Sequence, residues 1–133
     1  MKWSIQESPI DYSSLIISPG RETGSVVVFQ GIVRGTDESR QLKALYYDSD
    51  ADLAKQELKN IMDEAIGKFK VDDINAVHRI GMIEPGEISL LVIVFSKHRK
   101  DGFRACEYVV DEIKSRLPIW KKDIFIDDSE RWH

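Results

Sequence analysis

The stretch Lys114-Ser115-Arg116-Leu117-Pro118-Ile119-Trp120-Lys121-Lys122 predicts a sharp corner between a helix and a strand. Pro118 fixes its own φ and disfavours helical backbone at Leu117, so a helix that arrives from the N-terminal side ends there. Lys114 then lies in the last helical turn, while Lys121 lies in extended chain just beyond the corner. From this rigid corner the two lysines can face one pocket.

A helix over residues 101–116 is predicted before the corner, and a strand over residues 119–126 after it. Lys114 falls at the border of the helix's apolar stripe, where its stem can pack while its ammonium group reaches a cleft. The residues expected to be buried along that stripe are Phe103, Cys106, Val110 and Ile113.

The first third of the chain is predicted to be mostly strand. A short strand over residues 2–6 and a helical turn over residues 11–17 come first. A β-branched, apolar run then indicates a buried strand over residues 25–33. The polar residues 35–40 read as a loop or hairpin tip, and residues 42–47 as the strand that returns from it.

The middle of the chain adds a long helix and an antiparallel pair of strands. Apolar residues at steps of three and four indicate an amphipathic helix over residues 50–70. Strands over residues 74–80 and 88–95 should pair through the turn Glu84-Pro85-Gly86-Glu87, because a Pro-Gly pair suits a tight reversal. The predicted class is α+β, a single domain over residues 1–133 with a mixed or antiparallel sheet and two main helices.

Composition limits the classes of function. The chain has 133 residues, of which 42% are hydrophobic and 32% charged, as expected for one globular domain. Its formal net charge of -4 argues against general nucleic-acid binding, which needs a broad basic face. No apolar run is long enough to span a membrane, and the N-terminus lacks the apolar core of a signal peptide. We therefore expect a cytoplasmic protein that binds neither nucleic acid nor membrane.

Cysteine and histidine give no metal-binding pattern. Cys106 is the single cysteine, and on the apolar stripe of a helix it should be an inert, buried thiol. The histidines, His78, His98 and His133, are too scattered to indicate a metal site. A histidine flanked by apolar strand residues, as His78 is, is usually a structural residue, so we leave it out of the predicted catalytic set.

A second basic segment, Lys97-His98-Arg99-Lys100-Asp101-Gly102-Phe103-Arg104, follows a predicted strand and opens the second long helix. Cations at the start of a helix are well placed to bind an anion such as phosphate, since free backbone N–H groups and the helix dipole point the same way. The alternative is an ordinary solvated basic loop. Similarly, Lys121 and Lys122 on their own are explained as edge-strand lysines that oppose aggregation. These cations and Arg34 lie in one site only if the sheet brings the ends of their strands and helix together.

Five segments of the chain form a pattern in this order: Gly24-Ser-Val-Val-Val-Phe-Gln-Gly-Ile-Val-Arg34, Val77-His-Arg-Ile-Gly81 with Pro85-Gly86-Glu87, His98-Arg99, Lys114-x-x-x-Pro118-x-Trp120-Lys121 and Arg131-Trp132. Together these segments resemble the large, catalytic subunit of molybdopterin synthase, the MoaE family. The resemblance covers nearly the whole chain from about residue 20 onward.

The resemblance implies a sulfurtransferase of molybdenum-cofactor synthesis with an α/β hammerhead fold. Its substrate is cyclic pyranopterin monophosphate, into which two dithiolene sulfurs are inserted to make molybdopterin. The sulfur arrives as a C-terminal Gly-Gly thiocarboxylate on a small ubiquitin-like partner subunit. Large subunits pair as a homodimer at the centre of a heterotetramer. No cofactor or metal is expected to take part.

The resemblance also implies roles for individual residues. Lys114 and Lys121 match the family's two essential lysines and are the expected catalytic residues. We expect Lys114 nearest the thiocarboxylate carbonyl and Lys121 as the second acid, base or charge stabiliser. The expected substrate-binding residues are Arg34, His98, Arg99 and Phe29, the first three around the anionic end of the substrate and Phe29 as an aromatic near the pocket.

This sequence departs from the family in places. Leu45-Tyr46-Tyr47-Asp48-Ser49-Asp50 stands where members often have a Glu-Ala-Tyr-like run, Lys97 stands where a small residue is common, and many relatives continue beyond Arg131-Trp132. Two other functions remain open. One is a non-catalytic dimeric adaptor that binds a ubiquitin-like tail or a phosphate ligand. The other is a phosphate-ester enzyme that works without a partner, although no metal set or nucleophile accompanies the cations.

Overall fold

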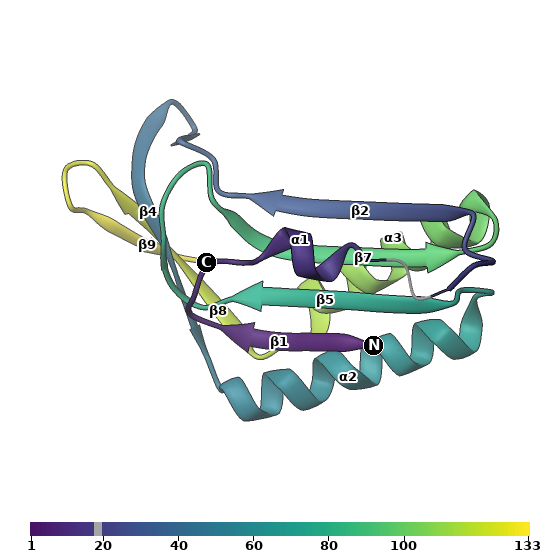
Figure 1. Ribbon diagram of the computed structural model, residues 1–133. Helices are drawn as coiled ribbons and strands as arrows, with labels where there is room; N and C mark the ends of the chain where they lie inside the picture. Colours follow the sequence, from purple (N-terminus) through teal and green to yellow (C-terminus); the bar gives the residue numbers. More distant parts are fainter. Residues whose placement is uncertain (18–19) are drawn as a thin grey trace.

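Two β-sheets and two long helices make up the computed structural model, which describes residues 1–17 and 20–133 (Figure 1). In the four-stranded sheet the order is β1 (Lys2–Gln6), β5 (Asp73–Arg79), β7 (Ile88–Ser96) and β2 (Ser25–Ile32). β1 is parallel to β5, while β5 and β2 are both antiparallel to β7. The predicted α+β class with a mixed sheet is therefore confirmed.

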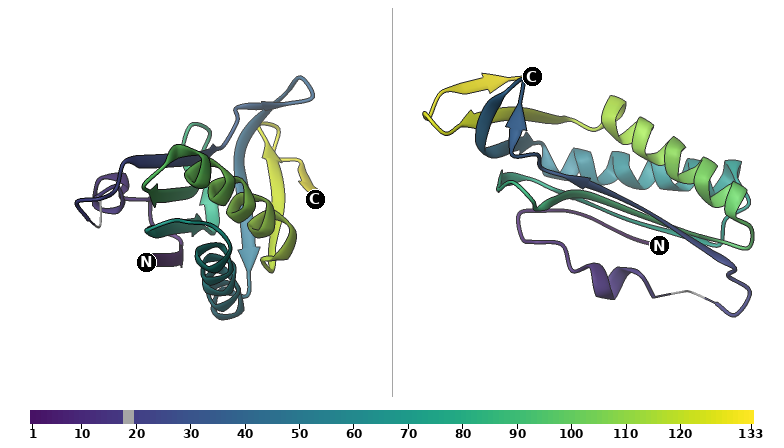
Figure 2. Two further views of the ribbon diagram at one scale, coloured as in Figure 1. Left: turned by 90° about the vertical axis from the view of Figure 1, so that its right-hand side faces the viewer. Right: turned by 90° about the horizontal axis from the view of Figure 1, so that it is seen from above.

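Helices cover both faces of the four-stranded sheet. Figure 2 shows α2 (Ala51–Lys68) and α3 (Arg99–Arg116) together on one face, and the short α1 (Tyr12–Leu15) on the other. β7 is buried on both sides because its side chains alternate between these layers. Leu90, Val92 and Val94 pack with α2 and α3, whereas Leu91, Ile93 and Phe95 pack with Leu15 of α1.

The second sheet forms one end of the molecule (Figure 1). It runs in the order β3 (Thr36–Asp37), β4 (Arg40–Ser49), β8 (Ile119–Phe125) and β9 (Glu130–Trp132), and β6 (Gly81–Ile83) also pairs with β4. All of these pairings are antiparallel. Its small core consists of Val33, Leu42, Leu45, Ile83 and Phe125, with Tyr47 at the edge.

The strand over residues 42–47 was expected to return along the strand over residues 25–33, and this expectation is wrong. Strand β2 pairs with β7, while β4 pairs with β8 and β6 in the other sheet. A hairpin does follow residue 35, but its first strand is the two-residue β3. Strands β6 and β9, at three residues each, were not predicted because a three-residue segment carries no period.

The buried stripe of α3 differs from the predicted one at Phe103, whose side chain is 60% exposed. The stripe instead begins at Gly102, which is buried, and continues through Cys106, Val110 and Ile113 as predicted. Small residues at this end allow the helix to approach the sheet closely, since an added Cβ at Gly102 would lie 3.0 Å from Val27 Cγ2. Phe103 therefore points away from the core.

Two local predictions are confirmed by the backbone. Helix α3 ends at Leu117, which is extended at ψ 135°, and β8 begins directly after Pro118. In the turn at residues 84–87, Gly86 has φ +89° and the backbone N–H of Glu87 donates to the carbonyl of Glu84 at 3.1 Å. Proline followed by a positive-φ glycine is the pattern of a type II turn.

Candidate functional site

A cavity of about 220 Å³ lies where the first sheet meets the second sheet and the end of α3. Strands from both sheets and the corner after α3 all contribute to its wall. The residues that line it are Phe29, Gly31, Tyr47, His78, Ser89, Leu90, Ile113, Lys114, Leu117, Ile119 and Lys121. Three of the six predicted site residues, Phe29, Lys114 and Lys121, are thus brought together.

Local structure explains why both lysines reach this cavity. Lys114 is in the last turn of α3. Leu117, which is extended, and Ile119 after it also line the cavity. Lys121 lies opposite Tyr47 in the pairing of β8 with β4. Neighbouring strand residues point to opposite faces, so Lys122 lies on the outer face, where its ammonium is 3.2 Å from Glu130 and 5.0 Å from the Trp132 ring centroid. Lys121 is the one of the pair that faces the cavity.

The other polar groups of the cavity are hydroxyls and an imidazole. Ser89 donates its hydroxyl hydrogen to the carbonyl of Gly31 at 3.1 Å, and Tyr47 hydrogen-bonds with Ser89. Burial raises the pKa of Tyr47 above its usual value, and hydrogen bonding with Ser89 opposes part of that rise. The phenol therefore stays protonated at neutral pH and presents an uncharged hydroxyl beside the two lysines.

His78, which is not in the predicted catalytic set, also lines the cavity. It lies on β5 and is 8% exposed. Burial, with a smaller contribution from the charge of Lys114, lowers its pKa to about 4. Its position could have been found from the strand period, because Ile74, Ala76 and His78 alternate onto the face that α2 and α3 cover.

Arg34 lies outside the set of residues that line this cavity. It follows β2 by two residues, and its side chain is 73% exposed. Its guanidinium is 3.5 Å from Asp37, which also pairs with Arg131 of β9. Arg34 is thus tied to the hairpin of the second sheet, three residues beyond Gly31 of the cavity wall.

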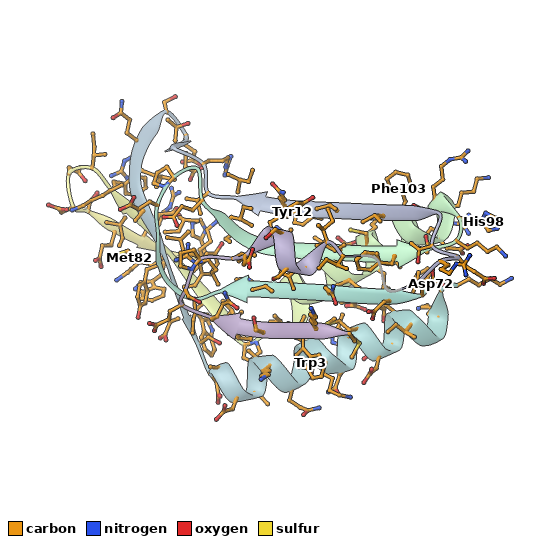
Figure 3. All side chains as sticks on the ribbon, in the orientation of Figure 1. Trp3, Tyr12, Asp72, Met82, His98 and Phe103 are labelled. Atoms are coloured by element: carbon orange, nitrogen blue, oxygen red, sulfur yellow. The ribbon has the colours of Figure 1, made fainter. Side chains whose placement is uncertain are left out.

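His98 and Arg99 lie at the opposite end of α3 from the lysines. They line a separate open pocket together with Lys97, Lys100 and Arg104. Figure 3 shows His98 at one end of the molecule and Met82 of the second sheet at the other. An 18-residue helix is roughly 27 Å long, so one chain does not bring these two basic groups together.

Cys106 lies on another face of α3, facing β2. It borders a shallow apolar pocket with Val27, Phe103 and Val110. Burial raises the pKa of its thiol to about 11, so the sulfur stays protonated at neutral pH. In the part of the chain that the structure describes, no group of three or more His, Cys, Asp or Glu residues is arranged to hold a metal ion, and no helix is long and apolar enough to cross a membrane.

The chain is similar to known proteins over nearly all of its length. The family model described as MoaE protein matches residues 5–116. The molybdopterin synthase catalytic subunit of Pyrococcus abyssi is 36% identical over 134 residues, which is 98% of this chain and 90% of the relative. The crystal structure of molybdopterin synthase from Staphylococcus aureus superposes with a TM-score of 0.90 at 35% identity, covering 98% of this chain and 95% of that one.

A more distant structure shares the fold. A Helicobacter pylori chain, from a complex of subunits 1 and 2 of molybdopterin-converting factor, has a TM-score of 0.75 at 22% identity and covers 98% of this chain and 88% of its own. The family match over residues 5–116 and the full-length likeness to catalytic subunits point to one family. This chain belongs to the MoaE family of molybdopterin synthase catalytic subunits.

Proposed function

We propose that the cavity beside Lys114 and Lys121 is the place where this subunit converts cyclic pyranopterin monophosphate to molybdopterin. The single observation that carries the proposal is that two lysines from different elements line one cavity in a chain of this family. Lysines there can bind an anionic substrate, stabilise an oxyanion and donate protons to a departing oxygen.

The proposed sulfur donor is the C-terminal thiocarboxylate of a small ubiquitin-like partner subunit. Cys106 supports this choice, because its thiol is buried, protonated at neutral pH and absent from the wall of the lysine cavity. A persulfide carrier needs an accessible thiolate, which this residue does not offer. The proposed compartment is the cytoplasm.

The proposed catalytic roles follow from the arrangement of the cavity. The thiocarboxylate sulfur displaces an oxygen of the substrate, and water then cleaves the resulting thioester, so the sulfur stays on the pterin and the partner leaves as a carboxylate. Lys114 stabilises the oxyanion that forms on the carbonyl in this cleavage, and Lys121 supplies the second charge or the proton for the departing oxygen. Phe29 forms an apolar part of the wall against which a flat pterin ring can pack. Arg34, just beyond the wall, is proposed to contact the phosphate when its weak, exposed ion pair with Asp37 opens.

His98 and Arg99 can act on the same substrate molecule as the two lysines only if a second copy of the chain supplies them. They are proposed to bind the anionic end of the substrate, yet α3 separates them from the lysines of their own chain. A homodimer that places the start of α3 of one copy beside the lysine cavity of the other satisfies both roles. We propose this homodimer as the centre of a heterotetramer with two small subunits.

The test is a reconstituted reaction with thiocarboxylated small subunit and the cyclic pterin, with product detected by fluorescence after oxidation. Lys114→Ala and Lys121→Ala should each lower turnover about 100-fold or more, because each removes a charge that stabilises the transition state. Lys122→Ala is the matched control, since that lysine is not in the cavity wall and its loss should leave turnover near normal. Near-normal turnover of Lys114→Ala contradicts the assignment, and binding without sulfur transfer by the wild type favours the adaptor function.

A further inference from the structure

The hydrogen bond of His78 determines which nitrogen of its ring carries the proton. Nδ1 lies 2.7 Å from the backbone carbonyl oxygen of Arg79. A carbonyl oxygen only accepts, so Nδ1 donates and a neutral ring leaves Nε2 with a free lone pair. No hydrogen bond among the described residues uses Nε2, and His78 borders the lysine cavity. The ring therefore offers the cavity one hydrogen-bond acceptor.

The surroundings of His78 keep the ring oriented and neutral. The ring of Tyr47 makes a T-shaped contact with it, with ring centroids 5.1 Å apart and an interplanar angle of 82°. The charged or titratable groups that line the cavity with it are Tyr47 from β4, Lys114 from α3 and Lys121 from β8. The neighbouring guanidinium of Arg79 is directed elsewhere, toward Glu87 at 2.7 Å and the backbone carbonyl of Glu7. No carboxylate is among the residues lining the cavity to favour a protonated ring.

Lys114 lacks a partner that would hold its ammonium group over the cavity. It is exposed, and it forms no ion pair or hydrogen bond with any residue that the structure describes. A free lysine side chain has about 2 kcal/mol of rotamer entropy, so an unguided ammonium samples many positions. Ser89 donates to Gly31 and hydrogen-bonds with Tyr47, whereas His78 Nε2 is an acceptor with no hydrogen-bond partner among the described residues.

We propose that His78 is a positioning residue for Lys114, whose ammonium group donates a hydrogen bond to the neutral Nε2 and is thereby held over the cavity. A neutral acceptor suits this task better than a carboxylate does. It orients the ammonium and leaves its positive charge unpaired, and so available to a developing oxyanion. The inference rests on the proposed catalytic role of Lys114.

A pair of amide variants separates the two nitrogens of the ring. The shorter amide of His78→Asn can still donate to the Arg79 carbonyl but places no acceptor where Nε2 lies. The longer amide of His78→Gln can place its oxygen near the Nε2 position. We expect His78→Asn to lower kcat about 10- to 100-fold with little change in KM, because one hydrogen bond to a charged group is lost. His78→Gln should restore most of that loss.

A nuclear magnetic resonance titration tests the tautomer of His78 and its coupling to Lys114. In the folded wild type, ¹⁵N-labelled His78 should show the tautomer with Nδ1 protonated and should titrate near its lowered pKa of about 4. In Lys114→Met both the ammonium charge and its hydrogen bond to Nε2 are gone, so the pKa of His78 should rise. An unchanged pKa, or a tautomer with Nε2 protonated, overturns the inference even if the amide variants fail to fold.

The possible failures are distinguishable. If Lys114→Ala keeps its turnover, the catalytic assignment under the proposed function is wrong. If Lys114→Ala loses turnover but folded His78→Asn keeps a normal kcat, or His78→Gln is as impaired as His78→Asn, the proposed function stands and the positioning role of His78 is overturned. Loss in His78→Asn with recovery in His78→Gln supports it.

Discussion

Replacing Gly102 with alanine tests how closely α3 must approach the four-stranded sheet. Alanine is favoured over glycine inside a helix by about 1 kcal/mol, so helix propensity alone predicts a more stable protein. The packing predicts the opposite. An added Cβ at Gly102 would lie 2.9 Å from Ser96 Oγ and 3.0 Å from Val27 Cγ2, both shorter than normal contacts.

Neither neighbour of Gly102 can move without loss. The hydroxyl of Ser96 donates to the backbone carbonyl of His98 at 2.7 Å, and Val27 packs against the core that α2 and α3 share. Overpacking of this kind costs about 1–3 kcal/mol. Against the gain of about 1 kcal/mol in helix propensity, the expected net loss in the free energy of unfolding is about 1 kcal/mol.

Urea unfolding at a fixed protein concentration measures this difference. Gly67→Ala in α2 is the matched control, because the Cβ it would add has no atom within 4 Å apart from its chain neighbours and the backbone of its own helix. That variant should gain about 0.5 kcal/mol, less than the full propensity because it lies in the last helical turn. If Gly102→Ala were stabilised as much as Gly67→Ala, the close packing of α3 on β2 would be refuted.

Two further outcomes are expected. Cys106→Ser should keep most of its sulfur-transfer activity in the reconstituted assay, and complete loss of activity in a folded variant would contradict the partner-donated mechanism. Hydrogen bonds from Arg116, then from Tyr108, lower the pKa of Glu64 to about 2, below its unfolded value of 4.5. This contribution to stability is present above pH 4.5 and is lost as the pH falls toward 2. Arg116→Met should therefore flatten the decline of unfolding free energy over that interval, and an unchanged slope would contradict the coupling.

Local sequence was sufficient for the features that depend on a few neighbouring residues. Pro118 removes a backbone donor and restricts Leu117, so the end of α3 and the start of β8 were predictable. Gly86 could be placed in a tight turn because it tolerates a positive φ. The long helices followed from their apolar period.

The strand partners and the contents of the cavity were settled by contacts between distant segments. The pattern of residues 42–47 identifies a strand but cannot say that it pairs with β8 rather than with β2. Likewise, the basic residues at the two ends of α3 look alike in sequence, yet Lys114 lines the cavity and His98 lines a different pocket. The apolar residues Val77 and Ile80 favour a structural role for His78, while the groups that define its chemistry, Tyr47 and Lys114, lie on other elements. Periodicity records which face a side chain takes, but only the packing of the sheets and α3 sets what that face meets.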